Sequence, residues 1–150
     1  PNEDPRRPLA KKLIEYIPDN ATIVVYNSSF EKQIINSLAN LFPEYQKRLQ
    51  TMSSNIIDLL LPFQQNFFYT KEMRGSNSLK SVLPAIVPTL SYTDLEVSNG
   101  GQAGRKFLNL RNCNSQEEKS KTKKALLEYC KLDTLAMFEL LEKLKEVIKL

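Results

Sequence analysis

The 150-residue sequence contains no histidine and only two cysteines, Cys113 and Cys130. The lack of histidine excludes Ser-His triads, histidine-ligated zinc and histidine general bases, so any chemistry must use carboxylates, tyrosine, lysine or cysteine. The two cysteines fit neither a zinc spacing nor a disulfide framework, which favours a cytoplasmic location. Long apolar runs are also lacking. The longest, residues 56–63, is interrupted by Asp58 and Pro62, so we expect no membrane span.

The N-terminal residues lack the features of a signal peptide, because they read Pro1-Asn2-Glu3-Asp4. The missing initiator methionine suggests a piece of a longer protein, so the upstream portion of the same polypeptide is an expected partner. Hydrophobic residues make up 41% and charged residues 25% of the sequence, which is typical of a globular protein and predicts one domain over residues 1–150. The net charge of +4 suits an anionic partner, although basic composition alone does not identify one.

Hydrophobic patterns predict an α/β layer fold with at least one parallel strand pair. Two β-branched runs without alternation, residues 22–26 and 56–61, are typical of buried strands. A helix is expected before the first run, from Asp4-Pro5 to Pro18. Further helices are expected over residues 30–41, 43–52, 78–83 and 102–110, an extended segment over residues 91–97, and a long helix from the Ser115-x-x-Glu118 capping box to about Lys149.

Asp133 lies on the apolar stripe that we expect along the last helix, with Tyr129 one turn before it. An aspartate on a core-facing stripe is costly unless a basic residue, a hydrogen-bond network or a metal pairs with it. The alternative is that Asp133 sits at the edge of the stripe and reaches solvent or an arginine. The stripe consists of Leu126, Cys130, Met137, Leu141, Leu144 and Ile148.

Two further carboxylates are associated with the expected strands. Glu31 falls in the first turn of a helix just after the first strand, at the carboxyl edge where α/β sheets place their sites. The alternative is structural, because Ser28-x-x-Glu31 is itself a capping box and a first-turn glutamate complements the helix dipole. Asp58 lies inside the second apolar run, where orienting a loop or capping a helix is a better interpretation than chemistry.

The two motifs together resemble a known superfamily. Asn27-Ser28-Ser29-Phe30-Glu31 and Tyr129-Cys130-Lys131-Leu132-Asp133 are similar to the second and third motifs of the four-carboxylate 3′–5′ exonucleases, which include proofreading exonucleases and ribonuclease D. The tyrosine-type branch of that superfamily has tyrosine where the other branch has histidine, in agreement with this composition. The resemblance implies a ribonuclease-H-like fold, of which this chain would be the C-terminal portion, helix-rich, without the first antiparallel strands.

The chain is also similar, over nearly its whole length, to a bacterial domain-of-unknown-function family, family 2779, which is predicted to have the same exonuclease fold. This likeness rests on Tyr26 to Lys32, Ile57-Asp58-Leu59, Gly75 to Pro84, and Tyr129 to Thr134.

The resemblance implies a site that binds Mg²⁺ or Mn²⁺. Asp133 and Glu31 would be metal ligands, and Tyr129 would orient the attacking water. We therefore expect the side chains at positions 31 and 133 to converge on one pocket. The superfamily usually has aspartate where this chain has Glu31, and its first motif, Asp-x-Glu on an upstream strand, is missing. The chain by itself is therefore expected to bind metal poorly and to be inactive.

The expected substrate is a nucleic acid, DNA or RNA, bound without sequence specificity. Asn27 belongs to the second motif and is a candidate contact. Phosphate contacts are expected from Arg74, Lys80, Lys123 and Lys124, with Lys119 and Lys121 equally well explained as a solvated helix face. Phe67, Phe68 and Tyr69 could stack bases, but core packing is the better interpretation.

Two other functions remain open. One is a catalytically decayed domain that binds nucleic acid or protein, with Glu31 as a helix cap and Asp133 paired to a basic residue. The other is a homodimer formed through an exposed sheet edge.

Overall fold

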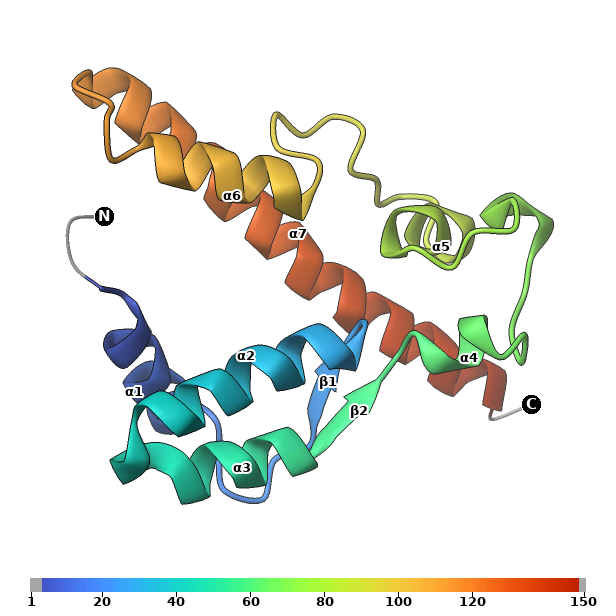
Figure 1. The fold of residues 1–150 in the computed structure, drawn as a ribbon. Helices are drawn as coiled ribbons and strands as arrows, with labels where there is room; N and C mark the ends of the chain where they lie inside the picture. Colours follow the sequence, from blue (N-terminus) through green and yellow to red (C-terminus); the bar gives the residue numbers. More distant parts are fainter. Residues whose placement is uncertain (1–3, 149–150) are drawn as a thin grey trace. The chain divides into compact units, whose positions relative to one another are not determined.

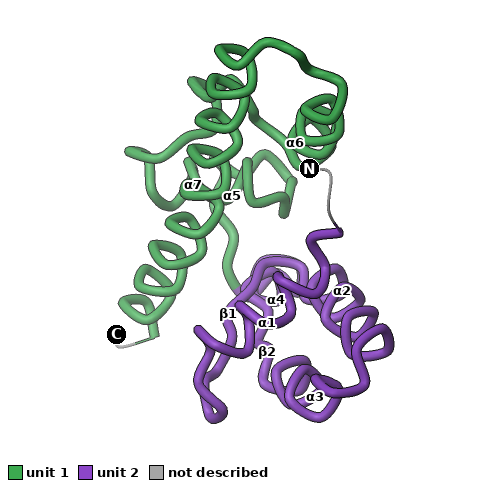
Figure 2. Tube along the Cα trace, turned by 90° about the vertical axis from the view of Figure 1, so that its left-hand side faces the viewer, with its two compact units in different colours: residues 1–2, 68–150 green, residues 3–67 purple. Residues whose placement is uncertain are grey.

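The computed structural model describes residues 4–148, and the chain divides into two compact units, residues 3–67 and residues 68–150 (Figure 2). The first unit contains a short two-stranded sheet with its helices, and the second is built around one long helix. The expected end of the last helix, about Lys149, lies outside the described residues. The sequence predicted one domain and did not indicate this division into two units.

The first unit is built around a parallel pair of three-residue strands. Val25 pairs with Asp58 and Ile23 with Ile56, so the two strands end side by side. Parallel strands need a long crossover, which the helices between them supply. The elements are α1 Arg6–Tyr16, β1 Ile23–Val25, α2 Ser28–Leu41, the 3₁₀ helix η1 Pro43–Tyr45, α3 Gln46–Ser54, β2 Ile56–Asp58 and α4 Leu61–Gln64 (Figure 1).

The core of the first unit lies between α1, α2 and α3. Its apolar side chains come from all three helices, which makes the crossover a packed helical layer rather than a loose connection. Arg48 of α3 fixes the turn after α1, because its guanidinium donates to the Ile17 carbonyl and pairs with Asp19 at 2.6 Å. The buried members of the core are Ala10, Leu38, Ala39, Phe42, Leu49 and Met52.

The second unit places two shorter helices against one long helix (Figure 1). The long helix begins where the capping box predicts, because the Ser115 hydroxyl accepts the Glu118 backbone N–H at 3.2 Å. The Asn99 side chain caps another helix by accepting the Gln102 N–H at 2.8 Å. The elements are the 3₁₀ helix η2 Lys71–Met73, α5 Leu79–Ile86, α6 Gly100–Asn109 and α7 Gln116–Ile148.

The buried side of α7 differs from the expected stripe. Ala125, Ala136 and Leu140 are buried, whereas Cys130 and Ile148 of the expected stripe are exposed. Apolar residues occur on several sides of this 33-residue helix, so periodicity alone does not select the side that packs.

The expected ribonuclease-H-like layered fold is wrong. Within residues 4–148, β1 and β2 are the only strands, and helices make up most of the remaining regular structure. Residues 91–97, which we expected to be extended, form bends and turns without a strand partner. The physical reason is that only two apolar runs of the described sequence are short and β-branched, while the other apolar positions recur with helical spacing.

In the described part of the chain, no helix combines the length and the apolar character needed to cross a bilayer.

Candidate functional site

Asp58 holds together the ends of both strands and the start of α2. Its carboxylate accepts the backbone N–H of Asn27 at 2.9 Å, of Ser28 at 2.7 Å and of Leu60 at 2.9 Å. The register that places Asp58 opposite Val25 brings it to this turn. Burial acts to raise the pKa of Asp58, but the hydrogen bonds from Ser28, Leu60 and Asn27 outweigh it and lower that pKa. Asp58 is therefore an ionised carboxylate that orients the strand-to-helix turn.

The turn itself differs from the expected Ser28-x-x-Glu31 capping box. α2 begins at Ser28, and the preceding Asn27 adopts a left-handed conformation with φ 75° and makes no side-chain cap. Asparagine tolerates this conformation better than most residues. Asp58 supplies the missing acceptor from the end of β2, so the cap comes from a residue thirty positions away.

Glu31, in the first turn of α2, has one carboxylate oxygen with no partner among the described residues. Its Oε2 atom is buried and accepts no hydrogen bond. Burial raises the pKa of Glu31; a bond from its own backbone N–H opposes this, and the negative charge of Asp58 adds to the rise. A carboxylate oxygen can only accept, so an unpartnered one calls for a proton or a cation. Glu31 has the chemistry of a cation ligand as well as that of a helix-terminal glutamate.

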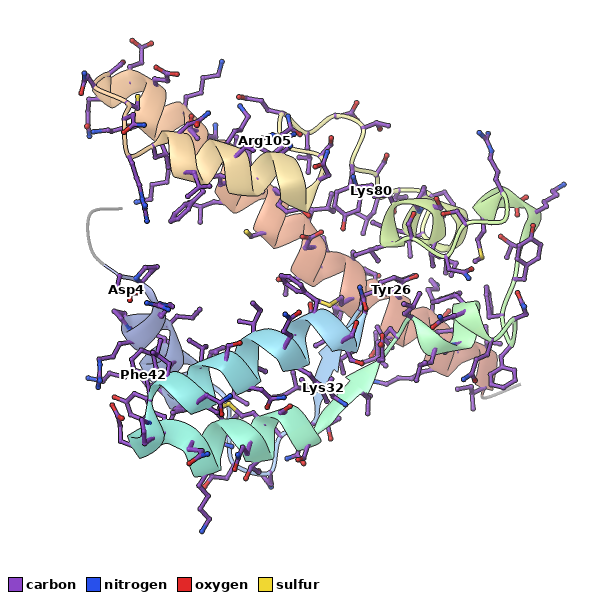
Figure 3. All side chains as sticks on the ribbon, viewed as in Figure 1. Asp4, Tyr26, Lys32, Phe42, Lys80 and Arg105 are labelled. Carbon is purple, nitrogen blue, oxygen red and sulfur yellow. The ribbon has the colours of Figure 1, made fainter. Side chains whose placement is uncertain are left out.

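A hollow of about 450 Å³ opens beside this turn, within the first unit. Lys32 of α2 (Figure 3) and Asp58 both line it, so it presents a positive and a negative group together. Tyr26, in the segment between β1 and α2, packs its ring 6.3 Å from that of Phe63, and burial followed by the Asp58 charge raises its pKa. The remaining lining residues are Ser28, Ile56, Ile57, Leu61, Pro62, Gln65 and Phe67.

Asp133, in the second unit, is held by two tyrosines. The Tyr92 hydroxyl donates to Asp133 Oδ1 at 2.6 Å, and the Tyr129 hydroxyl also hydrogen-bonds to this carboxylate. The two rings lie 6.2 Å apart. Burial, then the bond to Asp133, raises the pKa of Tyr129 to about 12 and raises that of Tyr92 as well. Both phenols therefore stay protonated at neutral pH and act as donors.

Of the partners weighed for Asp133 in the sequence, the cluster supplies hydrogen bonds, and neither an arginine nor a lysine pairs with it in the described residues. Tyr92 was missed. It lies 41 residues before Asp133 in an irregular segment, where no periodic pattern points to a partner. The first residue of α6 is also close: a Cβ at Gly100 would lie 3.9 Å from the Tyr129 hydroxyl.

Glu31 belongs to one compact unit and Asp133 to the other, so their expected convergence on one pocket stays a prediction. Among residues 4–148, no three histidine, cysteine, aspartate or glutamate side chains are grouped so that they could hold a metal ion. The metal site likewise stays a prediction.

The basic candidates are spread over several elements. Arg74 and Gly75 follow η2 with φ 52° and 73°, and Lys80 lies in the first turn of α5 (Figure 3). On α7, Lys124 is 4.0 Å from Glu128, whereas Lys123 lines a groove between α6 and α7. These positions are exposed or partly exposed, as contacts with phosphate require.

The expectation that the aromatic segment packs in the core is wrong for two of its members. Phe67 is 79% exposed and Tyr69 is 55% exposed.

Comparison with known proteins shows the family of this chain. The model of a domain of unknown function, DUF2779, matches residues 1–78, and the chain belongs to that family. The match includes Glu31 and Asp58 and ends before Tyr129 and Asp133.

The chain is also similar to two curated Mycoplasma proteins. It is 33% identical to "Uncharacterized protein MG366 homolog" of Mycoplasma pneumoniae, over 79% of this chain and 20% of that protein. It is 27% identical to "Uncharacterized protein MG366" of Mycoplasma genitalium, over 93% of this chain and 23% of that protein. The chain therefore spans less than a quarter of the length of these relatives. No solved structure matches it.

Proposed function

We propose that this chain is part of a metal-dependent 3′–5′ exonuclease, and that Glu31 and Asp133 each supply a metal ligand in the complete polypeptide. The observation that carries the proposal is the buried, unpartnered Oε2 atom of Glu31 beside the Asp58 carboxylate. The donor chemistry fits Mg²⁺ or Mn²⁺, which prefer carboxylate oxygens, and the sequence offers no histidine as an alternative ligand. When bound, such an ion polarises a phosphate and lowers the pKa of an attacking water.

The residues of the chain have separate tasks in this proposal. Asp58 keeps the turn before α2 in place through its three backbone bonds, which positions Glu31. Tyr129 remains protonated, so its hydroxyl can orient a water molecule by donating or accepting a hydrogen bond. Tyr92 holds Asp133 in one orientation, a positioning role that the sequence did not indicate.

The 150-residue chain alone is proposed to be inactive. No Asp-x-Glu motif, which would complete the four carboxylates, lies upstream of Glu31 in this sequence, and no three candidate ligands come together in the described residues. Two acidic ligands hold a divalent ion far more weakly than a complete set.

The test compares the complete polypeptide with this chain on single-stranded DNA and RNA labelled at the 5′ end, with MgCl₂ or MnCl₂. We expect a ladder of products shortened from the 3′ end for the complete polypeptide and none for the chain. Glu31→Gln and Asp133→Asn in the complete polypeptide should each lower the rate about 100-fold or more. Glu117→Gln, which changes an exposed glutamate in the first turn of α7, is the matched control and should leave the rate unchanged. Hydrolysis that survives both substitutions would contradict the proposal.

A second candidate is a binding module without catalysis. It is favoured by the way the two aspartates are already engaged: Asp58 by three backbone donors and Asp133 by two tyrosines. In that case the complete polypeptide should retain labelled nucleic acid equally with EDTA or MgCl₂ and leave it intact. Arg74→Glu with Lys80→Glu should then weaken retention, while Glu31→Gln should not.

A further inference from the structure

The hairpin formed by α6 and α7 has a second hollow. Its lining contains none of the residues proposed to bind a metal or to orient the attacking water. This groove has a volume of about 450 Å³ and its walls are almost entirely apolar. Both helices contribute to it, and both belong to the same compact unit. We call it the α6–α7 groove; it is lined by Phe107, Leu110, Lys119, Lys123, Leu126, Leu127 and Cys130.

The apolar walls of the α6–α7 groove are open to solvent. Phe107 of α6 is 44% exposed and Leu127 of α7 is 60% exposed. Single exposed apolar residues are ordinary, but several that line one concave surface are typical of a binding site. An occupant that covers these side chains would therefore gain from their removal from water.

The two lysines give the groove a charged end. Lys119 and Lys123 lie four residues apart and so share one face of α7, on the side nearer the connection to α6. In the described part of the chain no carboxylate forms an ion pair with either of them. Lys106 and Lys124, by contrast, are paired with Glu96 at 2.8 Å and with Glu128 at 4.0 Å. The α6–α7 groove therefore combines apolar walls with two lysines that form no ion pair in the described residues.

We propose that the α6–α7 groove binds a single-chain amphiphile with an anionic head, a long-chain fatty carboxylate. The hydrocarbon chain would lie along Leu126, Leu127 and Phe107, and the carboxylate would meet Lys119 and Lys123. The volume lies within the usual range for small-ligand sites, roughly 300 to 1,000 Å³. The charge complementarity excludes a cationic amphiphile.

The test titrates the 150-residue chain with sodium dodecanoate below its micelle concentration, followed by ¹H–¹⁵N NMR. We expect saturable binding of one molecule, with shifts concentrated at the groove residues of α6 and α7. Dodecyltrimethylammonium, with the same tail and the opposite charge, should bind at least about tenfold more weakly. Butanoate, with the charge and little tail, should not saturate.

Variants test the two lysines and the apolar wall of the groove separately. The double variant Lys119→Glu, Lys123→Glu should weaken dodecanoate binding about tenfold or more. Leu127→Asp, at an exposed position, should weaken it without unfolding α7, which circular dichroism checks. The double variant Lys11→Glu, Lys47→Glu makes the same change of charge on exposed lysines of the first unit and should bind as the unchanged chain does.

Three outcomes would overturn the proposal: equal binding of the cationic and anionic amphiphiles, unchanged binding by the Lys119, Lys123 variant, or shifts that lie elsewhere. Concentration-dependent association that Leu127→Asp abolishes would show instead that a second copy of the chain fills the groove. The nuclease test and this test use different residues, so the failure of one leaves the other standing.

Discussion

Two aspartates, one in each compact unit, lie within apolar patterns and obtain the hydrogen-bond donors that their carboxylates need in different ways. Asp58 takes its hydrogen bonds from backbone N–H groups at a helix start, whereas Asp133 takes them from the side chains of Tyr92 and Tyr129. Backbone donors at a helix N-terminus add to the favourable helix dipole and lower the pKa of Asp58. The comparison shows that a carboxylate within an apolar pattern marks a constrained turn in one unit and a polar side-chain cluster in the other.

The largest effect is expected from Asp58→Ala. The substitution leaves the N–H groups of Asn27, Ser28 and Leu60 without their acceptor and removes the cap of α2, so it should lower the free energy of unfolding by about 2–3 kcal/mol. The midpoint of urea unfolding, followed by circular dichroism, measures the change. Asp94→Ala, at an exposed aspartate, is the control and should shift stability by less than about 0.5 kcal/mol. Equal effects would show that Asp58 does not organise the turn.

A smaller effect is expected from Tyr92→Phe. It removes the hydroxyl that donates to Asp133 Oδ1 and keeps the ring packed, so the loss should be about 1–2 kcal/mol. Urea unfolding measures the stability, and the signals of the Asp133 side chain in NMR report its local environment. Tyr45→Phe, which changes a tyrosine of the first unit, is the matched control. If Tyr92→Phe and Tyr45→Phe lowered the free energy of unfolding equally, the hydrogen bond from Tyr92 would not stabilise Asp133.

The smallest effect is expected from Glu31→Gln, and it has the opposite sign. The pKa of Glu31 is raised in the folded chain, chiefly by burial, so the ionised form is disfavoured by folding. The unfavourable contribution is absent below the unfolded pKa, near 4.5, and appears as the pH rises through the folded pKa. Glu31→Gln should therefore stabilise the chain at pH 7, by less than about 1 kcal/mol because the group is partly screened by solvent, and have no effect below pH 4.

The contribution of Asp58 to the free energy of unfolding depends on pH in the opposite direction. Its folded pKa is lowered below 3.8, so its contribution is fully present above that value and is lost as the pH falls through the folded pKa. Unfolding curves between pH 2 and 7 distinguish the two groups. A Glu31→Gln variant that is less stable than the unchanged chain at pH 7 would show that the carboxylate has a favourable partner.

The local elements could be predicted because their signals are short-range. Residues 23–25 and 56–58 form strands where β-branched runs predict them, and they pair in parallel as the intervening helices require. The Ser115 cap and the long helix after it follow from the same kind of pattern. The fold class was wrong because it depended on a resemblance in motifs rather than on strands present in this sequence.

The candidate site was predicted only in its acidic members. Glu31, Asp58 and Asp133 stand out in the sequence because buried carboxylates need partners, and Tyr129 is noticed only because it lies one turn before Asp133. Their partners could not be found in the same way. Tyr92 reaches Asp133 from an irregular segment, and the bonds to Asp58 involve backbone N–H groups, which every sequence carries at every non-proline residue.

The sequence by itself determined approximately where both strands and the longer helices lie, which chemistry the absence of histidine excludes, and which carboxylates carry a burial cost. Only the tertiary structure decided how that cost is met, which side of α7 packs, and that Asp58 rather than Ser28-x-x-Glu31 caps α2. The reason is that patterning acts over a few neighbouring residues, whereas hydrogen-bond partners and packed faces depend on which distant segments the fold brings together.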